Sequence, residues 1–168
     1  MSAERADGAA PGEGALTHLD ARGQARMVDV SGKPVTAREA SAVGLVRCSA
    51  EVVALLRGEG VPKGDALAVA RLAGIQAAKR TPELVPLAHP VAVHGVRVDA
   101  EVTDEGVALR ATVRTADRTG VEMEALTCVS VAALALVDMV KAVDRHTEIT
   151  GIRVVAKSGG RSGDWRRE

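Results

Sequence analysis

The sequence places an aspartate and a lysine, Asp138 and Lys141, near the end of a long apolar segment. Side chains three residues apart share one face of a helix. Because Asp138 directly follows the apolar stretch, we expect its surroundings to be partly dry and its pKa to respond to the lysine charge. The pair is therefore a candidate for acid–base catalysis, and the alternative is an ordinary solvated ion pair.

Two further carboxylates, Glu122 and Glu124, flank the apolar Met123 at the start of the same segment. Acidic residues at a helix start are commonly caps or partners of the helix dipole. A closely spaced pair just outside the helix has another use, because its two carboxylates can accept hydrogen bonds from the donors of one ligand. A guanine-like ring carries such donors, so this motif is a candidate ring-binding site.

A histidine lies between two prolines in the segment LVPLAHP, which contains Leu87, Ala88 and His89. Near neutral pH a histidine can act as an acid, a base or a hydrogen-bond donor to phosphate. A surface or capping histidine is the alternative. His94 follows five residues later, but no cysteine or carboxylate converges with the pair, so we predict no metal site.

The chain end is basic and rich in glycine, with Lys157 followed by SGGRS at residues 158–162. Small residues let backbone N–H groups approach an anion, and lysine and arginine supply positive charge. The segment lacks the order of a P-loop, and the alternative is a flexible linker. Lys63, at the start of another predicted helix, is a further positive charge.

Hydrophobic periodicity predicts the elements that must position these residues. A strand over 35–49 leads into a short helix that ends at Gly58 or Gly60, and Pro62 opens a second helix over 63–80. Alternation predicts a hairpin over 91–103 and 106–117, with core candidates Val96, Val98, Val107, Leu109, Ala111 and Val113. A buried helix over 121–145 and a closing strand over 147–157 complete the series.

The order β-α-β-β-α-β is typical of the ferredoxin-like fold class, an α+β architecture whose antiparallel sheet carries two helices on one face. Because the other sheet face stays open and one helix is very apolar, we expect further copies of the chain to cover them in a homo-oligomer. The predicted domain spans 16–158, after a disordered arm at 1–15 and before a Gly/Ser-rich tail at 159–168. From Lys157 onward no regular element is expected.

Composition argues against several classes of protein. The chain has 168 residues, and its 22 basic and 22 acidic side chains leave no net field to attract nucleic acid. Trp165 is the one aromatic residue, so an RNA-binding sheet lacks its stacking platform. Cys48 and Cys128 are too far apart in sequence to suggest a disulfide scaffold, a zinc module or an iron–sulfur site.

The sequence also favours a cytoplasmic protein without a membrane partner. The longest apolar run, Val131–Val137, is far shorter than the roughly 18 residues that a membrane helix needs. Residues 1–15 lack the apolar stretch of a signal peptide and carry acids that a transit peptide avoids.

The two acidic motifs of the buried helix lie far from each other. Glu124 and Asp138 are 14 residues apart, so roughly 21 Å of helix axis separates them at 1.5 Å per residue. One small substrate could hardly touch both in a single chain. If both belong to one site, a second copy must bring its own helix alongside in the opposite direction, which places the site at a two-fold interface.

The chain resembles the family of cyclic pyranopterin monophosphate synthase, the molybdenum cofactor biosynthesis protein C. Four blocks carry the resemblance between Leu16 and Trp165: LTHLDARGQARMVDVSGKPVTAREA, ARLAGIQAAKRTPELVPLAHP, GVEMEALTCVSVAALALVDMVKAV and VVAKSGGRSGDW. It implies a ferredoxin-like fold and a homohexamer, built as a trimer of dimers, with active sites at the dimer interface. It also implies a lyase that rearranges 3′,8-cyclo-7,8-dihydro-GTP to cyclic pyranopterin monophosphate with loss of pyrophosphate.

The resemblance further assigns roles to individual residues. The catalytic aspartate and lysine of the family fall on Asp138 and Lys141, and two further active-site lysines fall on Lys63 and Lys157. The substrate-contacting stretches fall on Leu87, Ala88 and His89 and on Glu122, Met123 and Glu124. Ala88 departs from a pattern that includes Cys, so this side chain has no part in the predicted chemistry. No resident cofactor is implied, and whether Mg²⁺ accompanies the triphosphate stays open.

Two other functions remain as alternatives. A small-molecule sensing domain is one, because fold alone does not give function and ferredoxin-like domains often bind ligands without converting them. An RNA-binding module is disfavoured by the zero net charge and the missing aromatic residues. Arg26, Asp29 and Arg38 in the first block either contact substrate or pair within the fold, and ion pairing is the simpler expectation.

Overall fold

The computed structural model describes residues 18–20, 22–58 and 61–168 of the chain. Its strands are β1 (Thr36–Arg47), β2 (Val93–Thr103), β3 (Gly106–Asp117), β4 (Glu148–Ser158) and β5 (Trp165–Arg166). Its helices are α1 (Ala50–Arg57), α2 (Ala66–Ala78), α3 (Thr81–Leu84) and α4 (Glu122–Val140). The predicted disordered arm, 1–15, lies outside the described residues.

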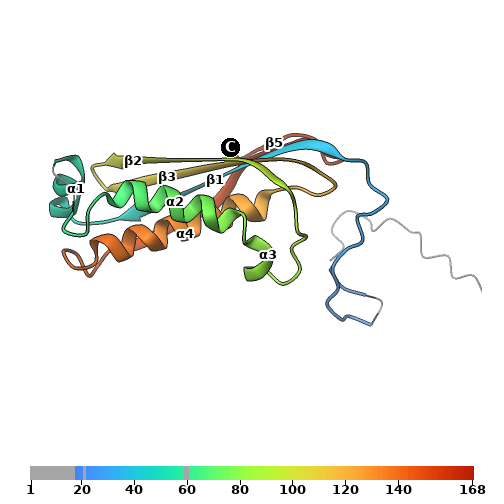
Figure 1. The fold of residues 1–168 in the computed structure, drawn as a ribbon, viewed down its shortest axis with the longest axis horizontal. Helices are drawn as coiled ribbons and strands as arrows, with labels where there is room; N and C mark the ends of the chain where they lie inside the picture. The colour runs from blue at the N-terminus through green and yellow to red at the C-terminus, as the bar shows by residue number, and fades with distance from the viewer. Residues whose placement is uncertain (1–17, 21, 59–60) are drawn as a thin grey trace, which may run out of the picture.

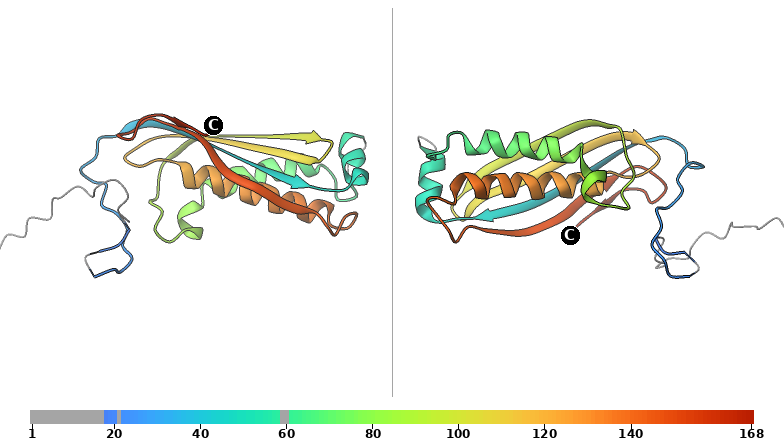
Figure 2. Two further views of the ribbon diagram at one scale, coloured as in Figure 1. Left: turned by 180° about the vertical axis from the view of Figure 1, so that it is seen from behind. Right: turned by 60° about the horizontal axis from the view of Figure 1, so that its bottom comes forward.

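The strands form one antiparallel sheet in the order β2-β3-β1-β4-β5, and α2 and α4 cover one of its faces (Figure 1). The first four strands have the predicted ferredoxin-like arrangement, and the α+β class is confirmed. Figure 2 shows the two helices side by side across the sheet, with α1 beyond one end of the strands. The opposite face of the sheet, called here the outer sheet face, carries no helix of the described chain.

Alternation along the strands decides which side chains enter the core. In β3, Val107, Leu109, Ala111 and Val113 are buried beneath the helices, and the intervening Arg110 and Arg114 are exposed. In β2, Val98 is buried as predicted. Val96 is only partly buried, next to a register shift between Val93 and Gly95 that interrupts the β2–β3 pairing.

Helix α4 is the central element of the core. Residues spaced along its inner face, including Ala125, Cys128 and Ala132, are fully buried. Gly74 of α2 allows the close approach of the two helices, because a Cβ there would lie 2.9 Å from the carbonyl oxygen of Cys128. By length and composition α4 resembles a membrane span, but 56% of its most apolar window is buried within this fold, as expected for a core helix.

Three helices differ from the sequence-based expectation. Helix α2 begins at Ala66 rather than after Pro62, because the Asp65 side chain accepts the backbone N–H of Ala68 and caps the helix there. Helix α4 ends at Val140, so the predicted extension to Arg145 is wrong. The short α3 was not predicted.

The prediction that no regular element follows Lys157 is also wrong. Strand β4 continues to Ser158, and Lys157 pairs with Trp165 of the two-residue β5. The Arg167 guanidinium lies 5.4 Å from the centre of the Trp165 ring, which adds a cation–π contact. These contacts fold the glycine-rich segment back against the edge of the sheet.

Candidate active site

The residues singled out from the sequence fall into two clusters at opposite ends of α4. The amino-end cavity contains Leu87, Ala88, His89, Glu122, Met123 and Glu124. The carboxyl-end cluster consists of Lys63, Asp138 and Lys141. Because the 14 residues from Glu124 to Asp138 lie in one helix, roughly 21 Å of helix axis separates the two clusters.

The amino-end cavity has a volume of about 300 Å³ and lies between the loop after α3 and the first turn of α4. All six predicted substrate-binding residues line it. His18, Val85, Thr119 and Gly120 complete the wall. The wall thus combines apolar side chains with a few carboxylate and imidazole groups, which is the usual composition of a small-molecule site.

Glu124 is the buried acid of this cavity, with only 2% of its surface exposed. Burial raises the pKa of its carboxyl group to about 7, and the negative charge of neighbouring Glu122 acts in the same direction. Gly120 makes room for the Glu122 carboxylate, which would overlap a Cβ at that position. Glu124 can therefore hold or release a proton near neutral pH.

His89 is held in a defined orientation. Its Nε2 lies 2.6 Å from the carbonyl oxygen of Val28. Because a carbonyl only accepts hydrogen bonds, Nε2 must carry a proton, and Nδ1 of the neutral ring is then the acceptor. The contact also holds the segment around Val28 against the loop that contains Leu87 and Ala88. His94 accepts the backbone N–H of Ala116 through Nδ1 and belongs to the β2–β3 ladder instead.

Lys157 lies at the amino end of α4, apart from the other two predicted lysines. Its Nζ is 3.4 Å from Oε1 of Glu122 and donates to Oγ of Ser162 at 3.0 Å. These residues line a small cavity of about 140 Å³ that shares Gly120 and Glu122 with the amino-end cavity. We call it the glycine-loop cavity; its other lining residues are Arg38, Glu39, Ser158 and Gly159.

Asp138 sits between two ammonium groups in the carboxyl-end cluster. Lys141 Nζ lies 2.6 Å from Oδ1, and Lys63 Nζ lies 3.1 Å from Oδ2 and 2.7 Å from the Asp138 carbonyl oxygen. Hydrogen bonds from Lys141 and then Lys63 hold the pKa of the Asp138 carboxyl below its ordinary value. Asp138 therefore stays ionised at neutral pH.

The expectation that Asp138 lies in partly dry surroundings is wrong, because 58% of its side chain is exposed. It lies two positions after the buried Leu136, which turns it about 200° round the helix axis and away from the core. Within this one chain the arrangement is the solvated ion pair that was the alternative interpretation, extended by a second lysine.

Sequence reasoning missed several lining residues. Thr119 and Gly120 directly precede the acidic motif, and this proximity is a signal that could have found them. Across the described part of the chain, none of Arg26, Asp29 and Arg38 forms an ion pair. Asp29 instead accepts the N–H of Ser31, and Arg38 donates to backbone carbonyls, so for these two residues the ion-pairing expectation is wrong within the described chain.

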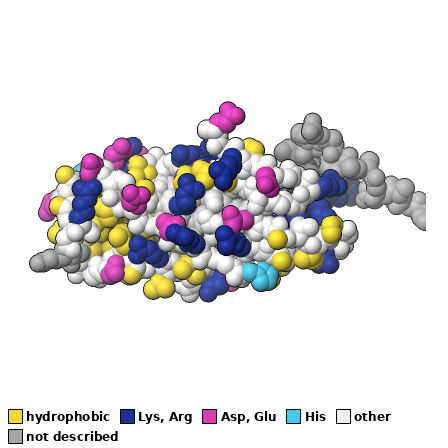
Figure 3. Space-filling model, turned by 90° about the horizontal axis from the view of Figure 1, so that it is seen from above, with side chains coloured by type: hydrophobic (Ala, Val, Ile, Leu, Met, Phe, Trp, Pro, Cys, Tyr) yellow, Lys and Arg dark blue, Asp and Glu magenta, His cyan; other side chains and the backbone are white. Residues whose placement is uncertain are grey.

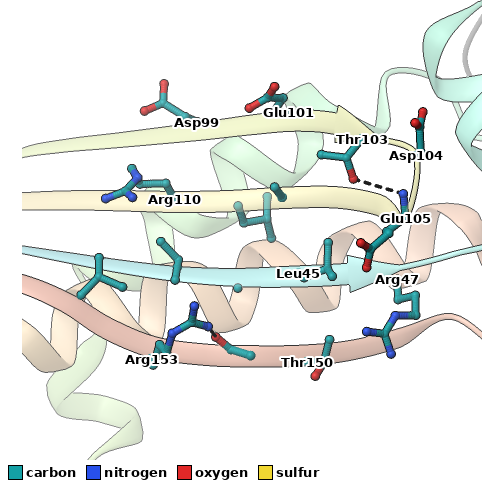
Figure 4. A pocket seen from close by; sticks show the side chains of 16 residues that line it. Leu45, Arg47, Asp99, Glu101, Thr103, Asp104, Glu105, Arg110, Thr150 and Arg153 are labelled. Atoms are coloured by element: carbon teal, nitrogen blue, oxygen red, sulfur yellow. Dashed lines mark hydrogen bonds between the residues drawn. The ribbon is translucent and has the colours of Figure 1, made fainter. Parts of the chain in front are cut away.

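A larger hollow than the amino-end cavity lies elsewhere, as an open groove of about 940 Å³ on the outer sheet face. Figure 4 shows Asp99 and Glu101 on β2, Arg110 on β3, and Arg153 on β4 around it. Figure 3 shows charges of both signs interspersed over this face. None of the predicted site residues lines the groove, so its size does not make it the candidate site.

Among the described residues, no three His, Cys, Asp or Glu side chains lie close enough together to hold one metal ion. The ionisable groups of the two clusters are instead carboxylates, ammonium groups and an imidazole. Such groups can bind a polar ring and anionic oxygens and can exchange protons with them.

Comparison with known proteins gives a consistent result across most of the chain. The family model described as the MoaC family matches residues 27–160. A cyclic pyranopterin monophosphate synthase of Nocardioides sp. JS614 is 68% identical over 155 residues, which cover 90% of this chain and 95% of that protein. Proteins with the same name are similar in Streptomyces avermitilis (65% over 157 residues, 94% and 92% covered) and Roseiflexus sp. RS-1 (58% over 152 residues, 89% and 96% covered).

Proposed function

The chain belongs to the MoaC family, and we propose that it is a cyclic pyranopterin monophosphate synthase of molybdenum cofactor biosynthesis. Its substrate is 3′,8-cyclo-7,8-dihydro-GTP, and its products are cyclic pyranopterin monophosphate and pyrophosphate, so it is a phosphorus–oxygen lyase. The observation that carries this proposal is the grouping of all ten sequence-predicted site residues at the two ends of α4.

The amino-end cavity binds the guanine-derived ring. Glu122 and Glu124 present carboxylate oxygens to the N–H donors of the ring, and Leu87, Ala88 and Met123 supply apolar contacts. A volume of about 300 Å³ suits one ring system of this size. His89 offers a further polar group to the ligand from the opposite wall.

The carboxyl-end cluster moves protons and stabilises phosphate oxygens. A sugar hydroxyl attacks the α-phosphorus, its proton passes to a base, and the bond from the α-phosphorus to the bridging oxygen breaks as pyrophosphate leaves. Asp138 is ionised and can accept a proton, while Lys63 and Lys141 place positive charge on either side of it. The same three groups exchange protons with the ring as it opens and the pterin forms.

A second copy of the chain completes each site. A two-fold axis passing Ser130 would relate position 138 to position 122, and Leu134 to Leu126, on antiparallel α4 helices. Leu134 and Met123 are exposed on α4, and Leu72 is exposed on the neighbouring α2. These uncovered apolar side chains support contact between helix layers, and we propose that the resulting dimers assemble three at a time into a homohexamer.

The cytoplasm is the proposed location of the enzyme, and its partners are the small-molecule substrate and further copies of itself. We propose that the enzyme works without a resident cofactor and binds neither nucleic acid nor a membrane. Mg²⁺, where required, would enter with the substrate triphosphate rather than occupy a site of its own.

A turnover assay tests the proposed function. The cyclised dihydro-GTP, freshly made by the radical enzyme that forms it, is supplied to the protein, and pyrophosphate and pterin are followed by mass spectrometry. We expect product with the unchanged protein and none with Asp138→Ala. Substrate that binds but stays unconverted by the unchanged protein would instead identify a sensing domain.

A further inference from the structure

Asp144 is a buried acid that lies three residues after Lys141, just beyond the carboxyl end of α4. Its Oδ1 accepts the backbone N–H of His146 at 2.8 Å, and its Oδ2 accepts the backbone N–H of Ser49 at 2.8 Å. The hydrogen bonds from His146 and then Ser49 hold the pKa of the carboxyl group below its ordinary value, so Asp144 is ionised at neutral pH. The proposed reaction uses neither of its oxygens.

The bond from Ser49 joins two segments that are 95 residues apart in the sequence. Ser49 is the amino-terminal cap of α1, and its Oγ accepts the backbone N–H of Val52 at 3.3 Å. The bond from His146 is local and closes the turn that follows α4. Asp144 therefore fixes the end of α4 against the start of α1.

The loop that follows α1 carries Lys63, whose ammonium group reaches the same end of α4. Its Nζ donates to Oδ2 of Asp138 at 3.1 Å and to the carbonyl oxygen of that residue at 2.7 Å. At the other end of α1, Arg57 pairs with Asp104 of the β2–β3 turn, but the Asp104 side chain is 93% exposed and surface pairs contribute little. The bond to buried, ionised Asp144 is therefore the stronger of these two ties on α1.

We propose that Asp144 is a positioning residue of the carboxyl-end cluster, which holds α1 and the following loop where Lys63 meets Asp138. The catalytic use of that meeting rests on the proposed function. An ionised aspartate suits the position because each of its oxygens accepts one backbone N–H. Asparagine has one oxygen acceptor and turns N–H donors toward the second backbone N–H, so this isosteric change breaks one of the two bonds.

Steady-state kinetics compares Asp144→Asn with Asp104→Asn, the same substitution at the exposed tie of α1. We expect kcat of Asp144→Asn to fall about tenfold or more with a smaller change in KM, because misplacing a reacting group by about 1 Å is enough for such a loss. Asp104→Asn keeps native kcat. Buried Val52 and Val53 hold α1 on the core, and thermal unfolding checks that both variants are folded during the assay. A folded Asp144→Asn with native kcat would overturn the proposal.

The donor side of the bond provides a second pair of variants. Ser49→Pro removes the backbone N–H that Asp144 accepts, and the φ of −64° at Ser49 suits the proline ring. Ser49→Ala removes the capping hydroxyl but keeps that N–H. We expect Ser49→Pro to reproduce the loss of kcat and Ser49→Ala to keep native kcat. Equal kcat values for the two folded Ser49 variants would show that this bond does not position the cluster.

A double-mutant cycle with Lys63→Met separates positioning from a general structural role of Asp144. Because Asp144 acts through Lys63, we expect Asp144→Asn to cause no further loss of kcat in the Lys63→Met background. If the two losses multiply instead, Asp144 acts independently of Lys63 and the proposal is wrong.

Crystal structures of the variants give a readout that does not require turnover. In Asp144→Asn we expect the distance between Lys63 Nζ and Asp138 Oδ2, which is 3.1 Å in the native chain, to exceed about 4 Å, the limit of an ion pair. In Asp104→Asn it stays native. An unchanged distance in Asp144→Asn would reject the positioning role. If the distance increases but the unchanged protein does not convert the substrate, the positioning role stands and the proposed function fails.

Discussion

The two ends of α4 carry the same functional group in opposite environments. At the amino end, burial raises the pKa of Glu124 to about 7. At the carboxyl end, Lys141 and Lys63 lower the pKa of the exposed Asp138. One helix therefore presents a carboxyl group that exchanges its proton near neutral pH and another that remains charged. The comparison shows that the surroundings of a side chain, more than its residue type, set the proton chemistry available to a site.

Removing the charged carboxylate has the largest expected effect. Asp138→Asn keeps the shape of the side chain but leaves two lysines without their counterion and removes a proton acceptor. We expect kcat to fall by roughly 10²- to 10⁴-fold, the usual contribution of a catalytic acid or base. The matched control is Asp104→Asn, an exposed partner of Arg57 in the β2–β3 turn, which keeps full activity. If turnover of Asp138→Asn stays within threefold of the unchanged protein, Asp138 has no catalytic role and belongs only to a surface ion pair.

Mixed oligomers test whether the two ends meet across an interface. Asp138→Asn and Glu124→Gln are each inactive or impaired alone, but a mixed dimer has one site with both native carboxylates. Random mixing makes half of the dimers mixed, so we expect activity to recover to about a quarter of the native value. The measurement is turnover after co-expression of differently tagged variants. No recovery in isolated mixed dimers would mean that both ends act within one chain.

The buried carboxyl gives a smaller but more specific effect. Ionised Glu124 accepts hydrogen bonds that a glutamine cannot fully replace, so Glu124→Gln is expected to lower kcat/KM about tenfold. Since the native group titrates at about 7, kcat/KM of the unchanged protein should rise between pH 6 and 8, and the rise should be absent in the variant. An identical pH profile for both proteins would assign the titration to another group.

The smallest expected effect is on stability. The folded protein holds the Glu124 proton more tightly than the unfolded chain, so the free energy of unfolding falls as pH rises from about 4.5 to about 7. Glu124→Gln removes this decline and should be more stable than the native protein at pH 8, by up to about 3 kcal/mol. Urea unfolding at several pH values and one protein concentration measures it, with exposed Glu51→Gln as the control. Parallel curves for the native and Glu124→Gln proteins would contradict the burial argument.

Strand order and core followed from local pattern, whereas the environment of individual site residues did not. Period-two alternation predicts the bounds of β3 and its buried side chains correctly. The apolar run of α4 predicts a core helix, but it does not show toward which side of the helix its last residues point. For this reason the exposure of Asp138 was predicted wrongly. The structure places Glu122, Glu124 and His89 around one cavity. The family resemblance, which assigns all three to substrate contact, predicts this grouping, whereas no local pattern does.

The role of Arg38 could not be read from sequence for a different reason. Its acceptors are backbone carbonyls 79 and 80 residues away, and a carbonyl has no residue-type signature. At the start of α2 two local signals compete, because Pro62 and Asp65 both favour a helix start. The helix begins after Asp65, whose side chain accepts the backbone N–H of Ala68. Contacts that depend on the backbone of distant segments become visible only in three dimensions.

The core is built without phenylalanine or tyrosine, and Trp165 is the one aromatic side chain of the chain. It lies on β5, paired with Lys157 and stacked against Arg167. Intrinsic tryptophan fluorescence of this protein therefore arises from one place, beside the glycine-rich loop at residues 158–163 and outside the hydrophobic core. Emission reports on events at that loop, and unfolding of the core changes it only when the β4–β5 pairing is lost.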